Sequence, residues 1–387
     1  GHNTLSSNTT ADNNTAIGNS ALFANTTASN NTAVGANALT SCTTGGENTA
    51  VGYDALKSHT TGNGRNTAVG AYAGDAITTA MENTAMGWHA LGAVTTGSEN
   101  TGLGRNAGKS ITTTEASTAV GFNALENNTA AQITACGHSA LRANTTGTGN
   151  VALGYNVLNA NTSGDRNVGI GYYSLANNTT GRSNFAAGYE ALYQNTTGSY
   201  NVALGPSALT ANTTGSNLVA IGNGAMQAGV SASETVAVGS SALYSNVDGI
   251  RNVAIGTSSL TNNTSGSGNL ALGYEAGAYN TEGNYNVFLG FQAGANETGS
   301  NKLYIGSSGG TLVYGDFSTG QVDLGQTSGT VTTLNDFNVD GDASFDGTAT
   351  VTGTSTLTGA VSAGSTLAVS GATTLSDTLA VSGATSL

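Results

Sequence analysis

Charged residues, proline, cysteine and long apolar runs are all scarce in this chain of 387 residues. Asp, Glu, Lys and Arg make up 8% of it, and the formal net charge is −13, whereas about 25% charged residues is usual in soluble domains. The basic residues form no cluster, which argues against a nucleic-acid partner or an anionic membrane surface. No apolar run reaches the length of about 18 residues that a spanning helix needs, so we predict no membrane span.

Motifs that carry chemistry are equally scarce. The four histidines are scattered, and no H-x-x-x-H, C-x-x-C or nucleophile-elbow pattern occurs. We therefore predict no enzyme activity, no cofactor and no metal site. Acidic residues gather at one place, where the candidates are Asp336, Asp340, Asp342 and Asp346. Their spacing matches no Ca²⁺ loop, so we interpret them as a solvated rim, with a Ca²⁺ site as the alternative.

What the chain has instead is a repeat. The phrase Asn-Thr/Val-Ala-apolar-Gly returns every 17 residues, with one step of 18 and two of 16. A short and steady period is typical of a solenoid, in which each repeat forms one coil stacked on the last. We number each coil from its glycine, which is position 0. These glycines are Gly18, Gly35, Gly52, Gly70, Gly87, Gly104, Gly121, Gly137, Gly154, Gly171, Gly188, Gly205, Gly222, Gly239, Gly256, Gly273, Gly290 and Gly306.

The three residues before each glycine alternate in kind. Position −1 is apolar, position −2 is almost always Ala, and position −3 is Thr in the first half of the chain and mostly Val in the second. This period of two predicts one strand per phrase, and we predict that −3 and −1 face the coil interior while Ala at −2 faces outward. A uniform outer Ala indicates close packing by a second layer of the chain or, as we favour, by a neighbouring protomer.

Two further positions recur in the coil. Asn at −4 is expected to stack amide on amide along the axis, with a carbohydrate-binding row as the alternative. Leu at +4 marks a return limb, followed by a turn rich in Asn, Thr and Gly. Three large apolar side chains per coil contribute about 5–8 kcal/mol, less than the roughly 1–2 kcal/mol per residue that ordering a coil costs. We therefore expect an oligomer, and a three-fold rod is the simplest closed form.

Aromatic residues often follow the glycine. Tyr155, Tyr172 and Tyr189 do so in three successive coils and should stack about 4.8 Å apart. We interpret this stripe as the cover of a subunit seam, with a glycan-binding site as the alternative. Sequons also recur in the turns, where turn chemistry alone explains them. As candidate N-glycosylation sites they are Asn25, Asn144, Asn161, Asn178, Asn195, Asn212 and Asn263.

The only two cysteines are Cys42 and Cys136, more than five coils apart. A coil advances about 4.8 Å, and a disulfide needs Cα atoms within about 7 Å. We therefore predict that the two cysteines do not pair within the chain.

The period changes after residue 306. Residues 307–336 read as a Gly-rich connector, and residues 337–387 repeat every six residues as a hexad stalk. A single chain would form only about three coils from these hexads, too little to bury a core of its own, so we predict a trimeric β-helical stalk. We expect the natural chain to continue beyond residue 387. The apolar phase of the hexads is Val339, Phe345, Val351, Leu357, Ala363, Val369, Leu375, Val381 and Leu387.

The segments Asn48 to Leu56 (NTAVGYDAL) and Asn201 to Gly205 (NVALG) resemble the head repeats of YadA-like trimeric autotransporter adhesins. They are equally similar to repeats in phage tail-fibre-like proteins, and the resemblance covers about residues 3–306. It implies a left-handed parallel β-roll and a homotrimer. The hexads, such as Thr366 to Gly371 (TLAVSG), resemble the stalks of such fibres. The adhesin repeat is typically shorter than 17 residues, and no position matches a family ligand motif.

The sequence thus predicts an all-β fold: a parallel β-solenoid over residues 1–306, followed by the connector and the stalk. We expect an extracellular structural fibre or adhesin shaft, on a cell surface or a virion, that associates with itself and attaches to a host-surface glycan or protein. The alternative is a carbohydrate- or ice-binding solenoid. The Thr column at −3 suggests ice, but it changes to Val midway, as an interior column would and a flat ice-binding face would not.

Overall fold

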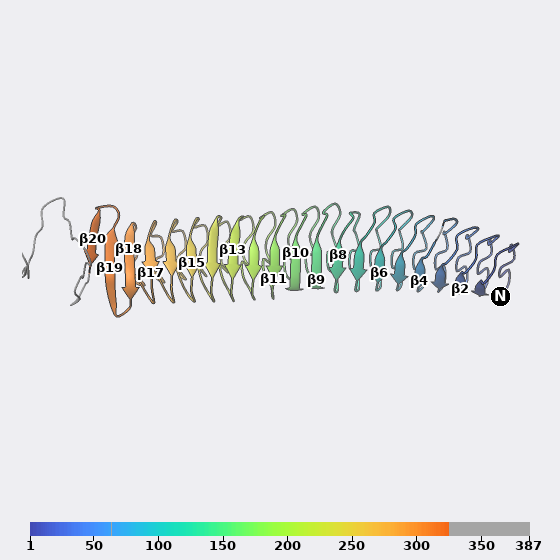
Figure 1. Ribbon diagram of the computed structural model, residues 1–387, viewed down its shortest axis with the longest axis horizontal. Coiled ribbons are helices and arrows are strands. Elements are labelled where there is room, and N and C mark those ends of the chain that lie inside the picture. The colour runs from blue at the N-terminus through green and yellow to red at the C-terminus, as the bar shows by residue number, and fades with distance from the viewer. Residues whose placement is uncertain (63, 325–387) are drawn as a thin grey trace, which may run out of the picture. The chain divides into compact units, whose positions relative to one another are not determined.

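The computed structural model describes residues 1–62 and 64–324, which form a parallel β-solenoid of about 17 turns with no helix (Figure 1). Strands β1 to β18 follow one another along the axis, and each pairs in parallel with the next. β18, β19 and β20 then pair antiparallel. The strands are β1 (Thr15–Ile17), β2 (Thr32–Val34), β3 (Thr49–Val51), β4 (Thr67–Val69), β5 (Thr84–Met86), β6 (Thr101–Leu103), β7 (Thr118–Val120), β8 (Thr134–Cys136), β9 (Val151–Tyr155), β10 (Val168–Tyr172), β11 (Phe185–Ala187), β12 (Val202–Leu204), β13 (Leu218–Ile221), β14 (Thr235–Val238), β15 (Val253–Ile255), β16 (Leu270–Leu272), β17 (Val287–Leu289), β18 (Lys302–Ser307), β19 (Gly310–Asp316) and β20 (Gln321–Leu324).

The register confirms that copies of the repeat lie directly over one another. Val168 pairs with Val151, and Ile170 pairs with Leu153, so that like positions meet at every step. Each N-x-A-h-G phrase forms one strand, as its period of two predicts. The rest of the coil, including the return limb, consists of turns and bends.

The direction in which the strand residues point is the reverse of our prediction. Ala at −2 lies inside the coil and is completely buried, as Ala186 and Ala203 are, whereas −3 and −1 are half-buried or exposed. The alternation was predicted correctly, but its phase was wrong. The reason is volume: the coil is too narrow to enclose two columns of Val and Leu, so it encloses the methyl groups of Ala and the Leu side chains at +4.

Two compensating substitutions show how little room the interior has. Val157 replaces Ala at +3, and Gly169 replaces the facing Ala at −2, where a Cβ would lie 2.5 Å from a Val157 methyl. Phe288 replaces Ala at −2 in β17, and Leu at +4 becomes glycine at Gly277 and Gly294. A Cβ on Gly277 would lie 2.5 Å from the Phe288 ring. At these positions the interior leaves no space for a further methyl group, as is usual in close-packed protein cores.

The return limb is held by backbone hydrogen bonds between coils. Leu192 N donates to Ala208 O at 2.9 Å, and Gln194 N donates to Thr210 O at 3.0 Å. The buried Leu at +4 has a left-handed backbone, with φ of +51° at Leu192. Such a conformation costs a non-glycine residue about 1–3 kcal/mol. It persists in coil after coil because the bonds to both neighbouring coils fix the backbone.

Two columns of asparagine run through the interior. At −4, Asn184 N and Nδ2 donate to Asn167 Oδ1 at 3.0 and 3.1 Å, which confirms the predicted amide stack. The second column stands at +7, where Asn195 Nδ2 donates to Asn178 Oδ1 at 2.7 Å and to Gly198 O at 2.9 Å. A buried amide such as that of Asn195 is thus bonded both to its own turn and to a neighbouring coil, as buried polar groups require. The column is not fully paired, because the Oδ1 atoms of Asn25, Asn212, Asn263 and Asn280 have no hydrogen-bond partner among the described residues.

The column at +7 is interrupted in the N-terminal coils. Cys42 and His59 occupy it there, and both side chains are buried. Cys42 Sγ donates to Gly45 O at 3.0 Å, and burial raises the pKa of this thiol to about 11. The His59 nitrogens have no hydrogen-bond partner in the part of the chain that the structure describes, and burial lowers the pKa of this imidazole from 6.5.

Because the His59 imidazole is buried, we predict that the folded protein loses stability in acid. Because the pKa of His59 is lower in the folded than in the unfolded chain, the unfolded state binds the proton first, and stability falls as pH drops below about 6.5. We expect a loss of up to about 2 kcal/mol between pH 6.5 and 5. His59→Asn, which installs the usual residue of the column, should remove this dependence when thermal unfolding is compared at the two pH values. The same pH slope in both proteins would contradict it.

The solenoid ends where β18 turns back into β19 and β20. These two strands lie in the stretch from 307 to 336 that we predicted to be a connector, so its first part is instead a hairpin that continues the sheet. Tyr304 replaces Ala at −2 in β18, and the centroid of its ring lies 5.9 Å from the centroid of the Phe288 ring. The remainder of the predicted connector, the acidic residues from Asp336 to Asp346 and the hexad stalk lie outside the described residues.

Candidate interaction surface

The outward side of the sheet carries two uncharged columns along β1 to β18, of which the −1 column is apolar throughout and the −3 column is apolar from β9 onward. Ile17, Leu153 and Ile170 at −1 are 61%, 40% and 39% exposed. The −3 side chains lie beside them and are mostly half-buried. Neither column contains a charged residue in any of these strands. Contiguous apolar patches larger than a few hundred Å² are rare on monomers and mark interaction sites. We call these two columns the outer face.

The outer face has two zones. From Thr15 to Thr134 the −3 column is Thr in every strand, and from Val151 onward it is Val, Leu or Phe. The Thr residues lie in register from one strand to the next. The change from Thr to Val had indicated an interior column, and this interpretation is wrong, because the −3 residues of both zones point outward.

The aromatic stripe stacks as its spacing predicts. The ring centroids of Tyr155 and Tyr172 are 5.0 Å apart with planes 10° from parallel, and those of Tyr172 and Tyr189 are 5.5 Å apart at 2°. In β9 and β10 the strand extends through the tyrosine, so these rings border the outer face.

The stack is longer than the three tyrosines that the sequence singled out. His138 lies between Phe122 and Tyr155, with ring centroids 5.0 Å from each. The Arg105 guanidinium continues it, 5.0 Å from the Trp88 ring and 5.4 Å from the Phe122 ring. The signal was present in the sequence, because all of these residues occupy position +1. We call this set the aromatic ladder: Trp88, Arg105, Phe122, His138, Tyr155, Tyr172 and Tyr189.

The geometry of the ladder bears on what it can bind. Sugars stack on the face of an aromatic ring, where the π electrons lie. Within the ladder the near-parallel faces of Tyr155, Tyr172 and Tyr189 are turned toward one another, so the rings present mainly their edges to solvent. The rings of the ladder therefore leave little aromatic face on which a sugar could stack.

The seven sequon asparagines all stand at +7 in the interior. Each is fully buried, and Asn161 is typical: its Nδ2, which would carry the glycan, donates to Asn144 Oδ1 at 2.7 Å and to Gly164 O at 2.9 Å. A glycan would break both bonds and has no path through the packed coil. The set comprises Asn25, Asn144, Asn161, Asn178, Asn195, Asn212 and Asn263.

We therefore expect the folded protein to carry no glycan at these seven positions, even when it is secreted from a host that glycosylates. Intact mass spectrometry checks this, and the mass should equal that of the bare chain over this region. A folded solenoid that carries hexose on Asn161 or Asn178 would contradict the packing described.

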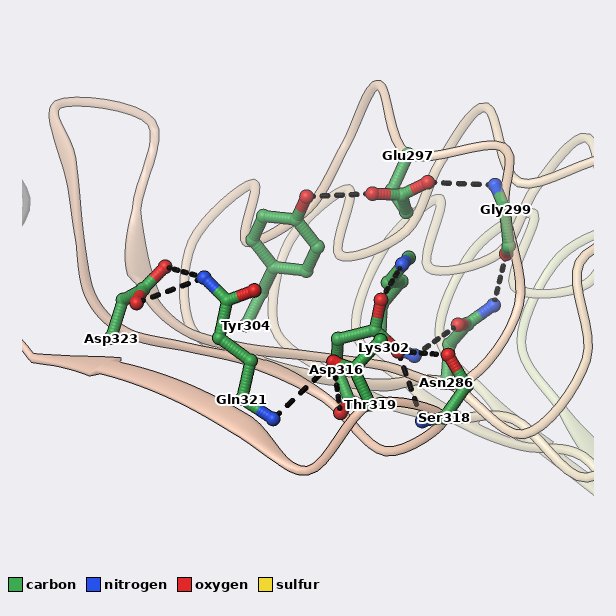
Figure 2. Close-up of polar contacts among 10 residues, drawn as sticks. All are labelled: Asn286, Glu297, Gly299, Lys302, Tyr304, Asp316, Ser318, Thr319, Gln321 and Asp323. Carbon is green, nitrogen blue, oxygen red and sulfur yellow. Dashed lines mark hydrogen bonds and ion pairs between the residues drawn. The ribbon is translucent and has the colours of Figure 1, made fainter. Parts of the chain in front are cut away.

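Charged residues end both asparagine columns at the C-terminal cap, by which we mean the last return limb together with β18, β19 and β20. Figure 2 shows Glu297, at +7, accepting from Tyr304 Oη at 2.6 Å and from Gly299 N at 2.7 Å. Lys302, at −4, donates its backbone N to Asn286 Oδ1 at 2.8 Å and its ammonium to Asp316. This ammonium lowers the pKa of the Asp316 carboxyl to about 2. Burial, with the bond to Glu297 as the next cause, raises the pKa of Tyr304.

The described residues hold no grouping of three or more His, Cys, Asp or Glu that could bind a metal ion, and no helix there could cross a membrane. Both cysteines are unpaired, as the spacing predicted. Cys42 is buried, and Cys136 lies half-buried on the outer face at −1. Comparison of the chain with protein-family models, with curated proteins and with solved structures found no match.

Proposed function

We propose that this chain is part of an extracellular structural fibre or adhesin shaft, of the cell-surface or phage tail-fibre type, whose copies associate along the outer face. The observation that carries the proposal is the absence of charge on that face over β1 to β18. At about 4.8 Å per strand the face is about 80 Å long. Association is favourable when a second copy covers such a surface, because burying apolar side chains lowers the free energy. The proposal gives the chain no catalytic role.

The zones of the outer face favour parallel association of like copies. In a parallel arrangement the Thr zone meets the Thr zone, so hydroxyl groups can bond to one another across the interface, and the Val zone forms a dry contact. An antiparallel arrangement would bury Thr hydroxyls against Val, where an unpaired hydroxyl costs about 1–3 kcal/mol. Three copies around one axis, each a left-handed roll, are the arrangement that the adhesin resemblance implies.

Sedimentation velocity tests the proposal. We expect the wild-type chain to sediment as a trimer and the double variant Leu153→Lys, Ile170→Lys to sediment as a monomer, because each lysine would bury a charge in the interface. The matched control is Asn177→Lys, Gln194→Lys, which places the same charges on exposed positions of the return limb. A monomeric wild type, or a double variant that stays trimeric, would sink the proposal.

The Thr zone supports a second candidate, ice binding. Eight strands, β1 to β8, present outward Thr in register beside an apolar column, with no charge between them. A regular and uncharged array of this kind is suited to ice recognition. Thermal hysteresis that is lost in Thr67→Lys, Thr84→Lys would favour this candidate. Absence of hysteresis in the wild type would dismiss it.

A further inference from the structure

A cavity of about 460 Å³ lies at the C-terminal end of the return limb. It lies beside the return limb from Gly294 to Glu297, which is the last return limb within residues 1–62 and 64–324, because the hairpin of β18 and β19 follows it. The volume falls in the range of small-molecule sites, roughly 300–1,000 Å³. The lining is Glu275, Tyr279, Gln292, Gly294, Ala295, Asn296, Glu297, Tyr304, Ser307, Ser308 and Thr311.

The cavity offers donors that the earlier coils use among themselves. In the preceding coil Gly277 N donates to Ala293 O at 3.0 Å and Tyr279 N donates to Ala295 O at 2.8 Å. The equivalent N–H groups of Gly294 and Asn296 have no acceptor among residues 1–62 and 64–324. Ser307, Ser308 and Thr311, which carry hydroxyl groups, line the same space.

The cavity also offers oriented acceptors. Glu275 Oε2 accepts from Gln292 Nε2 at 2.6 Å, and this bond is the main cause that lowers the pKa of the Glu275 carboxyl. Glu297 is fixed by Tyr304 and Gly299, as Figure 2 shows. A carboxylate oxygen that accepts one bond can accept another, and hydrogen bonds to a charged acceptor are the stronger kind.

The exposed ring of Tyr279 completes the site. Tyr279 is 57% exposed and, unlike the tyrosines of the aromatic ladder, stacks on no other aromatic ring of the described chain. Its ring faces are therefore available to a ligand. Two carboxylates line the cavity, and no Lys or Arg does, so an anionic ligand would be repelled.

From this combination we propose that the cavity binds a neutral oligosaccharide. Sugar hydroxyls donate to Glu275 and Glu297 and accept from the N–H groups of Gly294 and Asn296, while a pyranose ring lies against Tyr279. The site stands on residues of one chain. It is therefore independent of the fibre proposal, although a sugar site at one end of a fibre would serve attachment.

Isothermal titration calorimetry tests the site with cellotetraose and chitotetraose as neutral probes and trigalacturonate as the anionic one. We expect at least one neutral probe to bind once per chain, with Kd between about 10 µM and 1 mM, and trigalacturonate not to bind. Tyr279→Ala and Glu275→Gln should each weaken binding at least tenfold. Tyr285→Ala is the matched control, because it removes an exposed tyrosine of the same coil that lies outside the cavity.

Three results would overturn the site: no binding of either neutral probe, binding that survives both substitutions, or a signal abolished by EDTA. Glu275→Gln replaces one oxygen of a half-buried side chain by nitrogen and should leave the fold intact. This variant therefore still tests the site if Tyr279→Ala unfolds. The double variant Leu153→Lys, Ile170→Lys separates the two proposals. It should lose self-association and still bind the sugar.

Discussion

Gly188→Ala is expected to destabilise the solenoid by about 3–5 kcal/mol, the sum of backbone strain and a steric clash. Gly188 has φ of +143°, a region that non-glycine residues rarely adopt. A Cβ there would lie 2.5 Å from the carbonyl oxygen of Gly205 in the next coil. That oxygen belongs to the backbone and cannot move aside, so the column of glycines at position 0 is required by the stacking itself.

Chemical denaturation followed by circular dichroism measures the effect. The control is Gly149→Asn, because Gly149 stands at +12 with φ of +65°, and in other coils Asn30 and Asn217 hold this position with the same sign of φ. A Cβ at Gly149 would meet nothing closer than 3.6 Å. We expect this control to change stability by less than about 0.5 kcal/mol. Equal effects of the two substitutions would show that the glycine column carries no special constraint.

Asn178→Val is expected to cost about 2–4 kcal/mol, from buried groups left without partners. Asn178 Nδ2 donates to Asn161 Oδ1 at 2.7 Å and to Gly181 O at 3.0 Å, and its Oδ1 accepts from Asn195 Nδ2. A valine removes all three bonds. The apolar gain of burying valine does not replace them, because the neighbouring amides stay inside.

Three successive coils have an apolar residue instead of asparagine at +7, and they provide a comparison for Asn178→Val. Ile77, Val94 and Ile111 hold position +7 in three successive coils, where no neighbouring amide is left unpaired within that run. Ile77→Val should therefore cost only about 0.5–1.5 kcal/mol, the price of one methyl group, whereas Val94→Asn should cost as much as Asn178→Val. If Val94→Asn and Ile77→Val unfolded at the same denaturant concentration, the account of the column would be contradicted.

The sequence predicts the coil, the strand in each phrase and the stacking of like on like, because a period of 17 leaves few other solutions. It also predicts the amide stack at −4 and the tyrosine stack, which follow from equal positions in successive coils. The side on which Ala lies could not be predicted from hydrophobicity alone. Larger apolar residues normally point inward, but here the width of the coil decides, and the width depends on the path of the return limb.

The path of the return limb could not be predicted from the sequence, for a physical reason. Leu192 and its equivalents have a left-handed backbone, which leucine rarely adopts and which no propensity indicates. The left-handed Leu makes the coil tight and places the Asn at +7 inside, so sequons that read as surface turns became core. The cavity at the cap was equally hidden, because it depends on where the last coil stops rather than on any motif.

Parallel association of copies along the outer face is tested most directly with the two natural cysteines and a short bismaleimide crosslinker on the native protein. Cys136 is at −1 on the outer face, and Cys42 is in the interior at +7. If copies meet in parallel along the outer face, equal residues of different chains lie at the same height. Cys136 should then link chains into covalent dimers, while Cys42 stays unmodified until the protein is denatured. Modification of Cys42 in the native protein, or chains that remain unlinked through Cys136, would contradict the account.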